Sequence, residues 1–113
     1  MLLVEDDDDL RASFEEQLIE EGYWVESAEN GRVAWSRLTN GPRPDLIVLD
    51  LKMPLMSGWE LLDRLRASPT LIGVPVMIVS SNLGFPPAGA LAWLKKPVDP
   101  PRFVATVRRL LAA

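Results

Sequence analysis

The sequence contains two unbroken aliphatic runs, Leu46-Ile47-Val48-Leu49, which Asp50 follows, and Val76-Met77-Ile78-Val79, which Ser80 follows. Runs that are apolar on both faces are typical of central strands in a parallel sheet that helices cover on both sides. Three further strands are expected at 2–4, 24–27 and 92–95. Residues 1–113 are therefore predicted to form one α/β domain.

Amphipathic stretches between these runs predict helices. Helix-terminal signals lie at Gly22, at Asn30, at Asn40-Gly41, at the capping box of Ser57 and Glu60, and at Asp99-Pro100. Alternating strands and helices favour parallel pairing with right-handed crossovers, and thus three layers. The alternation breaks at 81–91, where two glycines and two prolines leave room for a loop or at most a single turn.

The composition excludes several kinds of chemistry. The 113 residues contain no cysteine and no histidine, so disulfides, thiol nucleophiles and imidazole bases are ruled out. No apolar run approaches the roughly 20 residues that cross a bilayer, and no basic-then-apolar leader opens the sequence. We therefore expect a cytoplasmic location without membrane contact. The net charge of −4 argues against a nucleic-acid surface.

Polar side chains follow four of the five predicted strands. Glu5 and Asp6 follow the first, Asp50 the third, Ser80 the fourth and Lys96 the fifth. Each also has a purely structural explanation, because acids favour a helix N-terminus, aspartate suits turns, and serine and lysine are common in exposed loops. Ligands of open parallel sheets bind beyond the carboxyl ends of the strands. The shared placement therefore favours a common site.

Three carboxylates that share a site either raise one another's pKa or recruit a cation. Without histidine or cysteine, an all-oxygen set selects a hard ion, and a few carboxylates that leave room for waters suit Mg²⁺ better than Ca²⁺. Such an ion, a lysine and a hydroxyl compensate the charge of a phosphoryl group, and an aspartate serves as its acceptor. The residues thus point to an aspartyl-phosphate site.

The chain resembles the receiver domains of two-component response regulators along essentially its whole length. The matching stretches are 2–7, 44–54, 58–62, 75–81 and 88–90, followed by Lys96-Pro97. The resemblance implies a flavodoxin-like (CheY-like) fold with a parallel five-stranded sheet in the order 2-1-3-4-5.

The resemblance also implies roles for individual residues. Asp50 matches the phosphoacceptor. Glu5 and Asp6 match the acidic pair that holds Mg²⁺ together with Asp50, and Lys52 is expected to add its backbone carbonyl.

Three further positions complete the matched set. Ser80 and Lys96 match the hydroxyl and the ammonium group that contact the phosphoryl group, and the Lys96-Pro97 peptide is expected to be cis. Trp93 stands at the place of the switch aromatic, where Tyr or Phe is usual.

These roles imply a signalling phosphoprotein. It would receive a phosphoryl group on Asp50 from a histidine kinase or phosphotransfer protein in a Mg²⁺-dependent reaction, and then switch the binding of a downstream protein. It would not be an enzyme beyond self-catalysed phosphorylation and dephosphorylation, and it would bind no nucleic acid. A phosphohydrolase that uses Asp50 is disfavoured, because Lys52 stands where such enzymes carry an acid.

The sequence departs from the family between Ser80 and Ala88, where only seven residues lie. The fourth helix of a receiver is therefore expected to be shortened or absent, leaving an apolar patch around Leu83, Phe85 and Leu91. This departure supports an alternative, in which a phosphorylation-independent pseudo-receiver acts as a protein-interaction module through residues 81–93.

Overall fold

The computed structural model describes residues 1–81 and 87–112, and its centre is a five-stranded parallel sheet. The strands are β1 (Leu2–Val4), β2 (Glu26–Ala28), β3 (Ile47–Leu49), β4 (Val76–Ser80) and β5 (Ala92–Lys95). Their order in the sheet is β2-β1-β3-β4-β5, and every neighbouring pair is parallel. The predicted flavodoxin-like architecture and strand order are confirmed.

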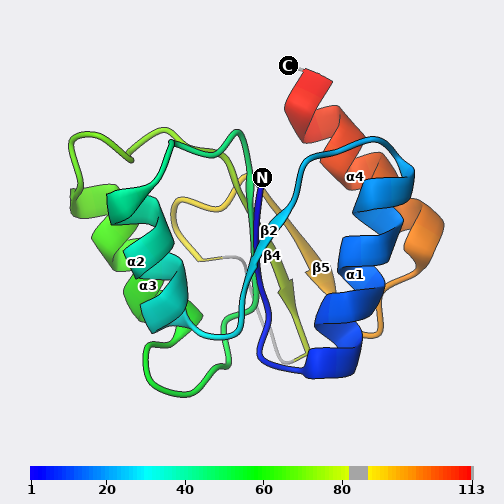
Figure 1. Cartoon of the computed structure of the whole chain (residues 1–113), viewed down its shortest axis with the longest axis horizontal. Helices are drawn as coiled ribbons and strands as arrows, with labels where there is room; N and C mark the ends of the chain where they lie inside the picture. The colour runs from blue at the N-terminus through cyan, green and yellow to red at the C-terminus, as the bar shows by residue number, and fades with distance from the viewer. Residues whose placement is uncertain (82–86, 113) are drawn as a thin grey trace.

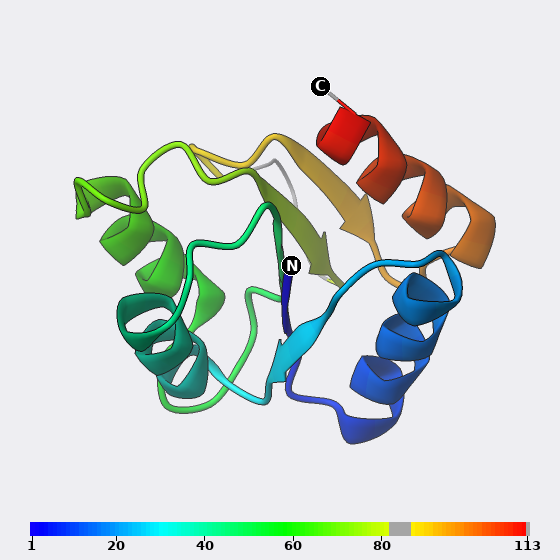
Figure 2. The same ribbon diagram turned by 45° about the horizontal axis from the view of Figure 1, so that its top comes forward.

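Helices cover both faces of the sheet, as Figures 1 and 2 show. One face packs against α1 (Asp8–Glu20) and α4 (Pro100–Ala112), and the other packs against α2 (Gly31–Asn40) and α3 (Gly58–Ala67). The rings of Phe14 and Phe103 stack between α1 and α4, with centroids 4.6 Å apart. The central strands β1, β3 and β4 are buried along their whole length, which explains their unbroken apolar sequences.

The predicted capping residues start their helices. The side chains of Asn30, Ser57 and Asp99 accept hydrogen bonds from the backbone N–H groups three residues further on, at 2.9, 3.2 and 3.2 Å. Gly22 follows the end of α1 with φ of +90°, a conformation that glycine adopts without strain. Local sequence therefore determines where these helices begin and end.

The second strand begins two residues later than predicted. The expectation was 24–27, but β2 spans Glu26–Ala28 and Trp24 is 82% exposed. An edge strand pairs on one side only, and the register of β2 is set by β1, where Leu2 lies opposite Glu26. The apolar residues at 24 and 25 have the sequence pattern of a strand. The limits of β2 depend instead on its pairing with β1.

The stretch between β4 and β5 contains no helix in the residues that the structure describes there. Ser81 is a bend, and a turn at Ala88 and Gly89 precedes β5. Leu91 is 65% exposed, as expected for the apolar patch, whereas Leu83 and Phe85 lie outside the described residues. Across the described ranges, every helix is too short or too polar to span a membrane.

Candidate functional site

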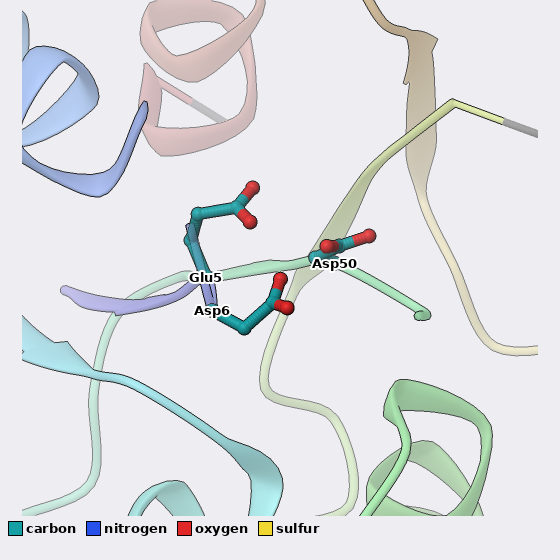
Figure 3. Close-up of side chains that lie close together, drawn as sticks. All are labelled: Glu5, Asp6 and Asp50. Carbon is teal, nitrogen blue, oxygen red and sulfur yellow. The ribbon is translucent and has the colours of Figure 1, made fainter. Parts of the chain in front are cut away.

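Three carboxylates meet at the carboxyl edge of the sheet (Figure 3). Glu5 and Asp6 directly follow β1, and Asp50 directly follows β3. Val4 lies opposite Leu49, and the Asp50 N–H donates to the Val4 carbonyl at 3.0 Å, so the two strands end level with each other. A carboxylate oxygen from each of the three acids lies within 4.8 Å of the others.

Lys96 directly follows the edge strand β5, and its side chain reaches this cluster. Its ammonium nitrogen Nζ lies 2.7 Å from Glu5 Oε1 and 3.3 Å from Asp50 Oδ2. The Lys96 backbone N–H donates to the carbonyl of Ser80 at 3.0 Å, and the Lys96-Pro97 peptide is cis. Glu5, Asp50 and Ser80 are buried, whereas Asp6 is exposed. One lysine thus pairs with both buried acids and leaves the third open to solvent.

The crowding of acids affects the protonation of Glu5. Burial raises the pKa of Glu5 from 4.5 to about 7, and the nearby charge of Asp50 adds to the increase. Hydrogen bonds from Lys96 and from the Asp7 N–H oppose this effect without cancelling it. Burial works against the charged form of Lys96, but its hydrogen bond to Glu5 and the charge of Asp50 raise the Lys96 pKa overall. Lys96 therefore remains a cation at neutral pH.

The backbone of the loop after β3 donates a hydrogen bond to the Asp50 side chain. The Lys52 backbone N–H donates to Asp50 Oδ1 at 3.3 Å, while the Lys52 residue itself is exposed. The two Asp50 oxygens therefore have different partners, an amide at Oδ1 and an ammonium group at Oδ2.

Gly58 is a residue to which the sequence patterns assign no role. Its N–H donates to the Leu51 carbonyl at 3.0 Å, at the start of α3. A Cβ atom at this position would collide with the Asp50 carbonyl oxygen and would lie 2.6 Å from Leu51 Cα. The start of α3 therefore packs directly on the backbone of Asp50, and the signal for this in the sequence is a glycine immediately after the Ser57 cap.

Replacement of Gly58 by alanine should test this close packing. We expect Gly58→Ala to lower the free energy of unfolding by about 1–3 kcal/mol, because a new methyl group must displace backbone, and to shift the amide signals of Asp50 and Leu51 in NMR spectra. Gly22→Ala is the control for backbone strain alone. Its φ of +90° strains alanine, but no atom lies within 4 Å of the added Cβ, so the Asp50 and Leu51 signals should not shift. A Gly58→Ala variant with unchanged stability and unchanged Asp50 signals would contradict this account.

Trp93, the expected switch aromatic, lies in the edge strand β5. It sits in β5 opposite Ile78, and the residues before and after it, Ala92 and Leu94, pack on the α1 and α4 side. The Trp93 side chain therefore faces the side of the sheet that α2 and α3 cover, and Trp93 is 36% exposed. No hydrogen bond joins Trp93 to the cluster among the described residues, so its role as a switch stays a prediction.

Comparison with known proteins identifies the family. The family model described as "Response regulator receiver domain" matches residues 1–108. The probable transcriptional regulator ycf29 of Porphyra purpurea is 34% identical over 98% of this chain and 56% of its own length, and the transcriptional regulatory protein PcoR of Escherichia coli is 34% identical over 98% and 50%. The chain thus spans about half the length of these curated relatives.

Solved structures agree with this result. The receiver domain of a signal transduction histidine kinase from Syntrophus aciditrophicus has a TM-score of 0.87 and 34% identity, over 98% of this chain and 88% of that one. Chemotaxis protein CheY4 of Vibrio cholerae has a TM-score of 0.86 and 30% identity, over 97% and 96%. With the family model covering nearly its whole length, this chain belongs to the response regulator receiver domains of two-component signalling.

Proposed function

We propose that this receiver domain accepts a phosphoryl group on Asp50 from a histidine kinase or phosphotransfer protein, and that the modified domain changes its binding to a downstream protein. The observation that carries the proposal is the contact of Lys96 Nζ with Asp50 Oδ2 at 3.3 Å, within a cluster of three carboxylates at one sheet edge. This arrangement combines a nucleophile, a fixed cation and a set of oxygen ligands.

The side chains around Asp50 have complementary tasks in this reaction. A carboxylate oxygen of Asp50 attacks the phosphorus atom, and the bond from phosphorus to the donor nitrogen breaks. Burial does not neutralise Lys96, because Glu5 and Asp50 raise its pKa overall, so its charge balances negative charge on the acceptor. The Lys52 N–H holds Oδ1, and the Ser80 hydroxyl, at the end of β4, is assigned to the phosphoryl oxygens.

The donor set fits Mg²⁺. Glu5, Asp6 and Asp50 offer only oxygen atoms, within 4.8 Å of one another, and few carboxylates with access to water match the preference of this ion. The Lys52 backbone carbonyl is proposed as a further ligand. When bound, Mg²⁺ would supply compensation for the negative charge on the phosphoryl oxygens.

The test is phosphorylation of the purified chain by phosphoramidate, followed by intact-mass spectrometry. We expect one phosphoryl group per chain with Mg²⁺ present and none with a chelator in excess. Asp6→Asn should weaken Mg²⁺ binding, measured by tryptophan fluorescence. The control is Asp9→Asn, which changes another exposed acid outside the cluster and should leave Mg²⁺ binding unchanged. Absence of phosphorylation with Mg²⁺, or equal phosphorylation with chelator, would refute the proposal.

The phosphorylation-independent alternative gains no support from the residues that the structure describes. All the matched polar residues are present, and Glu5, Asp50 and Lys96 are already in contact. The cytoplasmic location, the lack of nucleic-acid binding and the existence of a downstream protein target stay predictions. Cell fractionation and binding assays on the phosphorylated domain would test them.

A further inference from the structure

A hollow of about 280 Å³ lies near the acceptor, and two residues of its lining, Met53 and Trp59, have no part in the functions assigned so far. The described residues around it are Leu51, Lys52, Met53, Ser57, Trp59 and Ser80. Ser80 is the last residue of β4, next to the end of β3, so this hollow opens beside the edge where Asp50 lies. Its volume leaves room for a small ring beside a phosphoryl group.

The wall of the hollow is mainly apolar and aromatic. Trp59 is 47% exposed and Met53 is half-buried, so a ring and a thioether face a small molecule that enters. The described lining includes no carboxylate, and its one charged residue is Lys52. Such a surface offers packing contacts to a flat, aromatic group.

The packing of Gly58 places the backbone of the neighbouring residue, Trp59, close to the acceptor. Gly58 rests on the Asp50 carbonyl so closely that no Cβ atom would fit between them, and its N–H donates to the Leu51 carbonyl. Trp59 is the next residue, in the first turn of α3. The backbone that carries the indole ring is therefore packed directly against the backbone of Asp50 and Leu51.

We infer that Trp59 is a specificity-determining residue for the phosphodonor, because its ring packs against the aromatic leaving group of a phosphorylated imidazole. The inference rests on the proposed function. In the reaction, an Asp50 oxygen forms a bond to phosphorus as the phosphorus–nitrogen bond breaks, with its electron pair going to the ring nitrogen. The ring, protonated on its other nitrogen, leaves as neutral imidazole. Phosphoramidate transfers the same phosphoryl group but releases ammonia, which has no ring to pack.

The test compares the two donors on the same variants. With Mg²⁺ and phosphoimidazole or phosphoramidate, second-order rate constants are measured by intact mass for the parent, Trp59→Leu and Trp59→Phe. Trp59→Leu should lower the ratio of the phosphoimidazole to the phosphoramidate constant by about 3- to 10-fold, the worth of one aromatic contact. Trp59→Phe should keep most of the ratio. Trp24→Leu, which removes an exposed tryptophan at the amino end of the sheet, is the matched control.

The outcomes separate this inference from the proposed function. If the parent accepts phosphoryl groups but Trp59→Leu leaves the donor ratio as it was, the role of Trp59 is overturned and the proposed function stands. An equal fall in the ratio for Trp24→Leu also overturns it. If neither donor phosphorylates the parent, the proposed function fails and the inference fails with it. Thermal unfolding of each variant shows whether a fall in the donor ratio is caused by loss of the folded structure.

Discussion

Asp50→Asn is expected to abolish phosphoryl incorporation under conditions in which the parent takes up one group per chain. The substitution keeps the shape of the side chain but removes the carboxylate, and an amide oxygen is a poor nucleophile whose phosphoryl product would not be stable. The Asp50 side chain is 5% exposed, so the change falls inside the cluster. Intact-mass spectrometry after exposure to a small phosphodonor and Mg²⁺ measures the effect.

A matched control comes from the other end of the same segment. Asp45 lies two residues before β3, whereas Asp50 directly follows it. Asp45→Asn therefore makes the same chemical change at the amino end of the same strand. Asp45→Asn should be phosphorylated like the parent. Incorporation into Asp50→Asn at the parental level would mean that another residue is the acceptor, and the site assigned here would be wrong.

The second large effect is a dependence of stability on pH that originates at Glu5. The pKa of Glu5 is about 7 in the folded chain, against an ordinary value of 4.5. Below pH 4.5 both states hold the proton. Between pH 4.5 and 7 the unfolded chain has lost it while the folded chain retains it, so the free energy of unfolding falls as pH rises, by about 3 kcal/mol in total. Above pH 7 both states are ionised and this contribution stays constant.

No histidine titrates in this window, since the chain contains none. Urea unfolding at pH 5 and pH 8, with a chelator present, should therefore show a lower unfolding free energy at pH 8. Glu5→Gln cannot ionise and should lose most of this difference, although it also loses the ion pair with Lys96. Glu16→Gln, an exposed acid on α1, should keep the parental difference. An equal pH dependence in Glu5→Gln and the parent would contradict the role of Glu5.

The local features of the fold were predictable because their causes are local. Hydrogen bonds from helix caps span three residues, as at Asn30 and Ser57, and their signals lie within one stretch of sequence. The limits of β2 were less predictable, because an edge strand takes its register from β1, which lies more than twenty residues away in the chain. The exposure of Trp24 follows from that register and not from its own hydrophobicity.

The sequence by itself determined the residue types at the carboxyl ends of the strands, and with them a chemistry of carboxylates, a hydroxyl and a lysine. Only the tertiary structure decided that Lys96 bridges Glu5 and Asp50, that Glu5 is the buried acid while Asp6 faces solvent, and that Gly58 packs on the Asp50 backbone. The physical reason is that burial and charge pairing depend on groups brought together from distant parts of the chain. The identity of a side chain sets which proton it can lose, and its surroundings set the pH at which it loses it.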